Sequence, residues 1–169
     1  MVTTTKFTRA DYMALPEEYP AQLVEGELVR RPSLSVRHRQ ITGTVVRRLA
    51  ERVGDDRAVL GPMDVFLDDE NVFQADALVT PEPLPRSATE VGIPSLVVEV
   101  FAAGNRWLNR RRKLPHYLEA GVAEVWFVDP EAETVEIVTI RGDERFRGND
   151  RAASEIVPEF RLTPADLFA

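Results

Sequence analysis

One short apolar run restricts the fold more than any other feature of the sequence. Residues 95–101 read Ser-Leu-Val-Val-Glu-Val-Phe, an almost unbroken series of large apolar side chains. A strand that is apolar on both faces is found in sheets whose two faces are both covered, usually by helices. The run therefore predicts a central strand in a sheet that lies between helical layers.

Two longer segments have the pattern of helices that would form these layers. The first has an apolar stripe of side chains spaced four residues apart: Ile41, Val45, Leu49 and Val53. It is expected to begin at Ser33 or Ser35 and to end at Gly54. The second is expected over residues 105–119. Two shorter helices are expected, each after a threonine cap: Thr8 and Thr163.

Further runs of apolar and β-branched residues, separated by turn residues, predict the other strands: 58–60, 64–67, 72–79, 124–128 and 134–140. Residues 22–24 and 27–29 flank Glu25-Gly26 and predict a tight hairpin. No repeat or linker divides the 169 residues. We therefore expect a single domain over residues 1–169, with an α/β fold in which helices flank a mixed β-sheet.

Composition excludes several classes of protein. The chain has no cysteine, so disulfides, thiolate metal sites and a cysteine nucleophile are excluded. Its apolar runs are shorter than a membrane span, and a cytoplasmic protein without membrane contact is expected. The sequence contains neither a phosphate-binding glycine-rich loop nor a Gly-x-Ser-x-Gly elbow, and no organic cofactor is predicted.

The net charge is −7, but the positive charges are concentrated in two basic segments. Residues 30–52 contain seven arginines and one glutamate, and residues 106–113 contain four arginines, one lysine and no acid, which leaves −18 on the other residues. Such segments could converge on one surface that binds nucleic acid, although each alone is also typical of a solvated helix face. The arginines predicted to contact nucleic acid are Arg37, Arg39, Arg106, Arg110, Arg111 and Arg112.

Two acids interrupt predicted strands. Glu99 lies inside the apolar run of residues 95–101, and Asp76 lies inside the strand predicted over residues 72–79. A buried carboxylate needs a cation, hydrogen bonds or a raised pKa. Taken singly, Glu99 could pair with an arginine and Asp76 could cap a strand end. Together, on adjacent strands, they could share one Mg²⁺ ion, which takes its other ligands from water and phosphate.

Lysine is rare in this chain, and its placement is informative. The sequence has nineteen arginines but only two lysines, Lys6 and Lys113. Lys113 directly follows three arginines, so positive charge is already abundant there. A compact ammonium is not interchangeable with a guanidinium where it has to reach a water or a phosphate oxygen. Lys113 is therefore a candidate catalytic residue, with a chance occurrence as the alternative.

These residues belong to an ordered series of short motifs that covers nearly the whole chain. The motifs are LVEGEL (23–28), PS (32–33), RH (37–38), QAD (74–76), LVVEV (96–100), KLPHY (113–117), AGV (120–122), EVW (124–126) and VDP (128–130). No single motif is specific, but the ordered set resembles the PD-(D/E)XK nuclease superfamily. More narrowly, it resembles the Uma-two family of restriction endonuclease-like proteins.

This resemblance implies a metal-dependent endonuclease that hydrolyses phosphodiester bonds in DNA and acts as a homodimer. It implies that Asp76 and Glu99 bind Mg²⁺ or Mn²⁺, and that Lys113, in the helix after the second acid, positions the attacking water. Two accessory candidates are weaker. His38 could act as a base or phosphate contact, or be a helix-surface or interface histidine. Glu27 could be a metal ligand or a solvated turn acid.

The sequence also departs from the family pattern around its central groups. Residues that differ from those usual in the family are Gln22, Ala75, the segment 102–105 and Asn109. The three central groups are retained while their surroundings have changed. An alternative function therefore stays open, a catalytically silent module for nucleic-acid binding or assembly, and a third is a nuclease directed at RNA.

Overall fold

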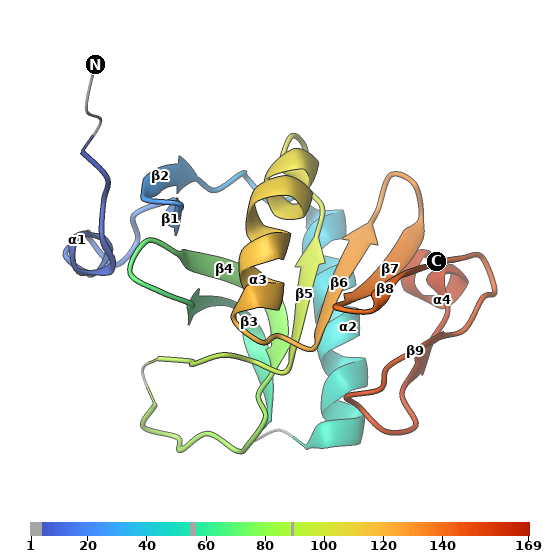
Figure 1. The fold of residues 1–169 in the computed structure, drawn as a ribbon. Coiled ribbons are helices and arrows are strands. Elements are labelled where there is room, and N and C mark those ends of the chain that lie inside the picture. Colours follow the sequence, from blue (N-terminus) through green and yellow to red (C-terminus); the bar gives the residue numbers. More distant parts are fainter. Residues whose placement is uncertain (1–4, 55–56, 89) are drawn as a thin grey trace.

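The computed structural model contains an eight-stranded mixed sheet in the described residues, which are 5–54, 57–88 and 90–169 (Figure 1). The strand order is β2-β1-β4-β5-β6-β7-β8, and β3 pairs with β4. The strands are β1 (Ala21–Val24), β2 (Glu27–Arg30), β3 (Ala58–Phe66), β4 (Val72–Val79), β5 (Leu96–Val100), β6 (Glu124–Asp129), β7 (Thr134–Thr139) and β8 (Gly142–Arg147).

Strand β5 occupies the middle of this order, as its apolar sequence predicts. Every residue of β5 is buried. It runs antiparallel to β4 and parallel to β6, so the sheet is mixed. The expected α/β fold with a mixed sheet flanked by helices is confirmed.

Helices cover the two faces of the sheet (Figure 1). On one face lies α2 (Val36–Val53), which begins after the Ser35 cap and ends at Gly54. On the other lies a helical segment made of η1 (Leu108–Lys113) and α3 (Leu114–Glu119). Alternate residues of β5 point to opposite layers. Val98 packs in the cluster that includes α2, whereas Val97 packs with residues of η1 and α3.

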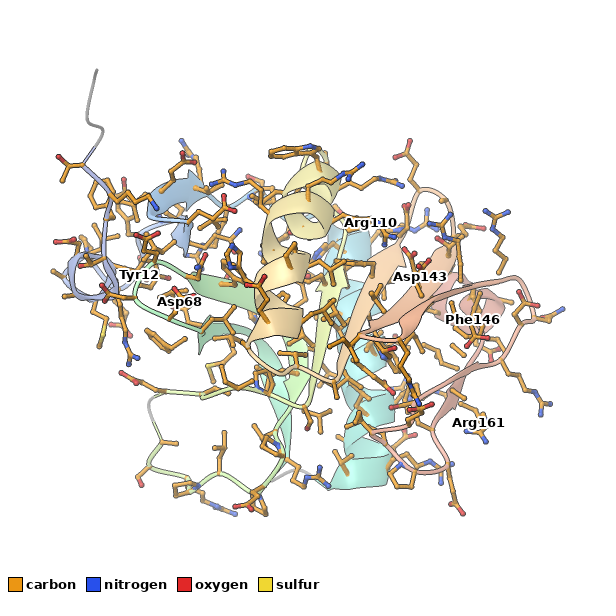
Figure 2. The ribbon with its side chains drawn as sticks, viewed as in Figure 1. Tyr12, Asp68, Arg110, Asp143, Phe146 and Arg161 are labelled. Carbon is orange, nitrogen blue, oxygen red and sulfur yellow. The ribbon has the colours of Figure 1, made fainter. Side chains whose placement is uncertain are left out.

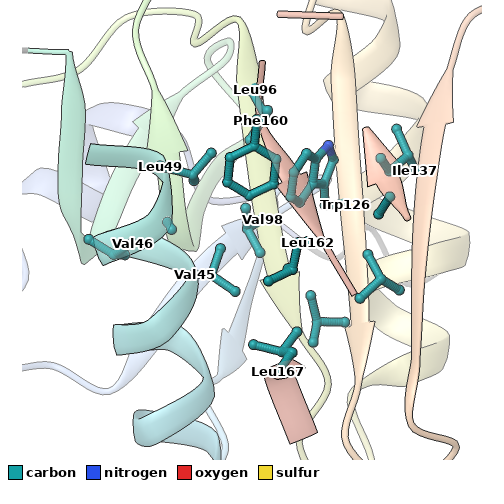
Figure 3. Close-up of a cluster of buried hydrophobic side chains, with 14 of the residues drawn as sticks. Val45, Val46, Leu49, Leu96, Val98, Trp126, Ile137, Phe160, Leu162 and Leu167 are labelled. Carbon is teal, nitrogen blue, oxygen red and sulfur yellow. The ribbon is translucent and has the colours of Figure 1, made fainter. Parts of the chain in front are cut away.

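The cluster on the α2 side is completed by the end of the chain (Figure 3). Phe160 packs against Trp126, with 5.1 Å between the ring centroids. Leu162 and Leu167 lie in the same cluster. The elements here are β9 (Ala152–Ala153), β10 (Arg161–Leu162) and α4 (Pro164–Phe168), with Thr163 as the cap of α4.

Two local elements at the start of the chain agree with expectation. Helix α1 (Arg9–Met13) is capped by Thr8, whose side chain accepts a hydrogen bond from the Asp11 backbone. The β1–β2 hairpin turns at Glu25 and Gly26, with φ values of 53° and 78°. Two successive positive φ values are the conformation of the tightest hairpin turns. No helix among the described residues is long and apolar enough to cross a membrane.

Two expectations were wrong in detail. The helix predicted over 105–119 is not a regular α-helix, because η1 is a π-helical turn in which the Leu114 N–H bonds to the Asn109 carbonyl. Pro115 follows directly, and proline cannot donate the bond that a regular α-helix would need there. Likewise the break predicted around Gly61 is a register shift inside one strand, β3, between Leu60 and Met63.

Candidate active site

The two strand acids come from neighbouring strands and face one cleft. Strand pairing places Ala77 of β4 opposite Val98 of β5, so Asp76 and Glu99 occupy the next position of the same antiparallel pair. Both line a cleft with a volume of about 440 Å³. The two acids therefore lie on adjacent strands, as the sequence predicts, and line the same cleft.

The backbone of Asp76 is in close contact with the irregular part of β3. A Cβ atom at Gly61 would lie 2.1 Å from the Asp76 carbonyl oxygen, a distance that no side chain can occupy. Glycine at position 61 therefore lets β3 approach β4 at the residue that carries the first acid.

The Asp76 carboxylate is held by the neighbouring strand and by α2. The Val100 N–H donates a hydrogen bond of 2.7 Å to Oδ2. His38 Nε2 lies 3.5 Å from Oδ1 and 3.0 Å from the Val100 carbonyl oxygen. Burial lowers the pKa of His38, but hydrogen bonding to Asp76 and the charge of Asp76 outweigh it, so the pKa is raised. His38 is thus a buried residue of the cleft wall, and the interpretation of it as a helix-surface histidine is wrong.

The Glu99 carboxylate is held from the opposite helical layer. Lys113 Nζ lies 2.5 Å from Oε1, and the Tyr117 hydroxyl donates to the same oxygen at 2.6 Å. Lys113 also donates to the Gln74 carbonyl oxygen at 3.3 Å. Burial raises the pKa of Glu99, and the nearby charge of Asp76 raises it further, against the opposing effect of Lys113. The site therefore concentrates negative charge that a cation would stabilise.

Lys113 contacts one of the two acids, Glu99, whereas Tyr117, which contacts the same carboxylate, was not predicted as a site residue. The ring of Tyr117 is fully buried against Phe73, as is typical of a core aromatic, but its hydroxyl contacts Glu99. Burial and the negative charge of Glu99 raise its pKa well above the ordinary value, so its hydroxyl stays a donor. The available signal was spacing, because Tyr117 follows Lys113 by four residues and shares its helical face.

The first basic segment borders the cleft. Its arginines in the cleft lining are Arg30, Arg31 and Arg39. Arg37, from the same segment, instead lies 3.0 Å from Glu133, and both side chains are exposed. Only part of the predicted basic surface is therefore next to the two acids.

The second basic segment is mostly paired within the protein. The side chain of Arg110, a residue of η1 labelled in Figure 2, lies 2.6 Å from Glu136. Arg112 lies 2.7 Å from Glu25. Arg106 lies 2.5 Å from Asp129. Arg110 and Arg112, which the sequence predicts to contact nucleic acid, are thus paired with acids of the protein itself.

The reason is that η1 lies over a sheet whose neighbouring strands and turns carry acids. These acids satisfy the guanidinium groups at short range. Arg111 is exposed, and no ion pair with it occurs among the described residues. The accessory candidate Glu27 pairs with Arg112 at 2.9 Å and does not line the cleft.

The donor set fits a divalent ion held by two carboxylates. Magnesium is usually bound through one or two carboxylates, with waters and substrate phosphates as its other ligands. Asp76 and Glu99 supply that pair. In the part of the chain that is described, no group of three or more histidine, aspartate or glutamate side chains could enclose an ion. A site of this kind would stay open to water and to phosphate.

Comparisons with known proteins identify the family and the fold of the chain. Residues 9–165 match the Uma2 family model, whose description is "Putative restriction endonuclease". The structure is similar to the crystal structure of "a putative nuclease belonging to DUF820" from Anabaena variabilis, with a TM-score of 0.83 and 21% identity over 96% of this chain and 97% of the other. No curated protein matches the sequence significantly. At this identity, the structural likeness establishes the fold.

Proposed function

Because this chain belongs to the Uma2 family of putative restriction endonucleases, we propose that it is a metal-dependent nuclease that hydrolyses phosphodiester bonds in DNA. One observation carries the proposal. Two carboxylates from paired strands, Asp76 and Glu99, line one cleft, and a buried lysine contacts the second of them. We assign Asp76 and Glu99 as ligands of Mg²⁺ or Mn²⁺ and Lys113 as the residue that positions the attacking water.

The surrounding residues are suited to hold these groups in place. A bound divalent ion would stabilise charge on the phosphate and lower the pKa of its water. Asp76 is oriented by the Val100 N–H, and Glu99 by the Tyr117 hydroxyl. The Lys113 ammonium has three donors, of which Glu99 and Gln74 take two. The third is the donor that we assign to the attacking water.

We further propose that the substrate backbone is held by the arginines of the cleft lining, Arg30, Arg31 and Arg39. Guanidinium groups bind phosphates through paired hydrogen bonds, and such contacts carry no sequence information. Two active sites could cleave the two strands of a duplex together. A homodimer would supply them.

A second candidate function is a module that binds nucleic acid without cleaving it. It is favoured by the burial of the Lys113–Glu99 pair, since the side chain of Lys113 is only 1% exposed. An ammonium that is sealed from the cleft would not reach a water, and the pair would then serve only to connect η1 to β5.

The test is a cleavage assay on labelled DNA and RNA with Mg²⁺, Mn²⁺ or EDTA, using the wild type, Asp76→Asn and Asp143→Asn. Asp143 is a matched control because it lies exposed on β8 at the sheet edge (Figure 2). We expect metal-dependent DNA cleavage that Asp76→Asn abolishes and Asp143→Asn leaves intact. Binding of DNA without cleavage under any condition would support the silent module, and cleavage of RNA alone would support the RNA nuclease.

Metal binding itself gives a second readout that does not depend on cleavage. A ligand that binds only the folded state raises the free energy of unfolding by about 2.7 kcal/mol at a hundredfold excess over its Kd. Mg²⁺ or Mn²⁺ should therefore raise the Tm of the wild type and of Asp143→Asn. Asp76→Asn should lose this increase. An equal increase in all three proteins would place the metal elsewhere.

A further inference from the structure

A smaller pocket opens beside the Asp76–Glu99 cleft and shares Asp76 with it. We propose that this pocket, which we call the α2 pocket, receives the base of the nucleotide next to the scissile phosphate. The inference rests on the proposed nuclease function and narrows its substrate to nucleic acid with an unpaired base at the site of cleavage. The α2 pocket has a volume of about 250 Å³ and lies between α2 and the irregular part of β3.

The shape of the α2 pocket suits one flat ring system. Its walls include Gly43 and Val46 of α2 on one side and Gly61 and Pro62 of β3 on the other. A Cβ atom placed on Gly43 would have no heavy atom within 4 Å, so the space in front of this glycine is open. Pockets for drug-sized ligands have volumes of about 300 to 1,000 Å³. A pocket below that range would hold a single base but not a whole nucleotide.

The lining combines apolar walls with groups that bind a ring face and a ring edge. Arg39 and Arg47 line the pocket, and a guanidinium stacks on aromatic faces as well as binding phosphate. His38 Nδ1 and Thr42 Oγ1 are buried and have no hydrogen-bond partner among the described residues. Buried polar atoms are nearly always paired in folded proteins. We infer that these two unpaired atoms, which belong to residues of the pocket lining, pair with hydrogen-bonding groups of a ligand once it is bound.

These features favour a base over the other parts of a nucleic acid. A phosphate has no apolar face to place against Val46 and Pro62. A deoxyribose has no flat face for stacking on a guanidinium. A base offers an apolar face and a hydrogen-bonding edge together.

The position of the α2 pocket requires the base that enters it to be unpaired. Leu34, His38, Arg39, Pro62 and Asp76 line both the pocket and the cleft. A base in the pocket would therefore place its own phosphate near the two acids. In a regular duplex the bases are stacked and paired inside the helix, so a base can enter only when it is extruded or already unpaired. Extrusion is easiest at bulges, mismatches and single strands.

The experiment fills the α2 pocket without disturbing the fold. Gly43 is an exposed residue inside α2, where methionine is a better helix former than glycine. Gly43→Met should therefore fold, and we expect its long, flexible side chain to reach into the α2 pocket that Gly43 lines. Gly92→Met is the matched control. Gly92 is also exposed, a Cβ placed on it would also have no heavy atom within 4 Å, and it lies outside the cleft and the α2 pocket.

Three DNA duplexes are compared: one with a single bulged nucleotide, one in which that nucleotide is abasic, and one fully paired. Affinity is measured by fluorescence anisotropy with Ca²⁺, and cleavage with Mg²⁺. We expect the wild type and Gly92→Met to bind the bulged duplex about tenfold more tightly than the other two, as one well-held base would produce. Gly43→Met should bind all three alike.

A second variant tests the hydrogen bonding of the base without adding a larger side chain. Thr42→Val keeps the shape of the side chain and removes the hydroxyl. It should reduce the preference for the bulged over the abasic duplex and leave affinity for the abasic duplex unchanged. Equal affinity of the wild type for bulged and abasic duplexes would overturn the proposal. The proposal would also be overturned if Gly43→Met lost the same amount of affinity for the bulged and for the abasic duplex. The group bound in the pocket would then be sugar or phosphate.

The same measurements separate this inference from the nuclease proposal. Base-dependent binding that Gly43→Met abolishes, without cleavage of any substrate, would support the α2 pocket and refute the nuclease. Cleavage with no dependence on the base would leave the nuclease standing and refute the α2 pocket.

Discussion

The ammonium of Lys113 lies 2.5 Å from Oε1 of Glu99, and the two side chains are only 1% and 4% exposed. Removing two charges from water is unfavourable, and their attraction offsets this only when the geometry is good and further hydrogen bonds are made. Tyr117 and the Gln74 carbonyl supply those bonds. The pair joins β5 to the π-helical turn of η1, and this connection holds a lysine against one of the two acids of the cleft.

Breaking the pair should be far more harmful than removing both of its charges. Lys113→Met leaves Glu99 buried without its cation, and loss of one partner from a buried pair costs about 3–5 kcal/mol. The double variant Lys113→Met/Glu99→Gln should recover much of that loss. Urea unfolding of the metal-free wild type, both single variants and the double variant at about pH 8 measures the effect. Additive losses in the double variant would show that the two side chains are not energetically coupled.

The Tyr117 hydroxyl should contribute to stability and to activity. Tyr117→Phe keeps the ring against Phe73 and removes the 2.6 Å hydrogen bond to Glu99. A bond to a charged group contributes about 1.5–3 kcal/mol, so the free energy of unfolding should fall by that amount. Tyr12→Phe is the control, because the Tyr12 hydroxyl donates to Asp64, which does not line the cleft. Cleavage should fall in Tyr117→Phe only.

Gly61 should tolerate no side chain, because its Cα faces the Asp76 backbone. A Cβ there would lie 2.1 Å from the Asp76 carbonyl oxygen, so Gly61→Ala would have to push β4 away. Overpacking of this kind costs about 1–3 kcal/mol, and it would move the Asp76 carboxylate. Gly92→Ala, where the Cβ meets open space, should change neither Tm nor cleavage. Full activity in Gly61→Ala would show that the position of Asp76 does not depend on β3.

The ion pair between Glu25 of the β1–β2 turn and Arg112 of η1 should stabilise the protein to a degree that depends on pH. Burial raises the pKa of Glu25, but hydrogen bonds from Arg112 and His116 outweigh it and hold the pKa below the ordinary 4.5. A lowered pKa in the folded state means that the stabilisation is present above about pH 4.5 and is lost as pH falls through the lower folded pKa. The urea midpoint of the wild type should therefore exceed that of Glu25→Gln at neutral pH and approach it in acid. A difference that does not change with pH would contradict this prediction.

Phosphate contacts should come from the cleft arginines rather than from η1. Binding to duplex DNA with Ca²⁺ should weaken as salt rises, with a log–log slope of about −0.9 for each phosphate neutralised. Arg39→Ala should flatten that slope by about one phosphate. Arg111→Ala removes an exposed guanidinium outside the cleft and should leave the slope unchanged. If Arg111→Ala flattened the salt slope as much as Arg39→Ala, the second basic segment would be part of the surface that binds nucleic acid.

Local sequence patterns were enough to predict most of the fold. The apolar run of β5 predicts a buried central strand, and the stripe ending at Val53 predicts α2 with its caps. The strand acids are equally readable, because Asp76 and Glu99 each interrupt an apolar run. Such features depend on neighbours one to four residues away, which the sequence displays directly.

Tertiary structure alone decided which partner each polar side chain meets. The arginines of η1 have the pattern of a basic surface, yet Arg110 and Arg112 are neutralised by acids that lie 26 and 87 residues away along the chain. In the sequence Tyr117 has the pattern of a core aromatic. Only the folded chain shows that its hydroxyl contacts Glu99 of β5. Charge and hydropathy are properties of a residue type, whereas pairing depends on distances that folding sets between remote segments. The acids and the lysine of the candidate site were therefore visible in the sequence, and their contacts only in the folded chain.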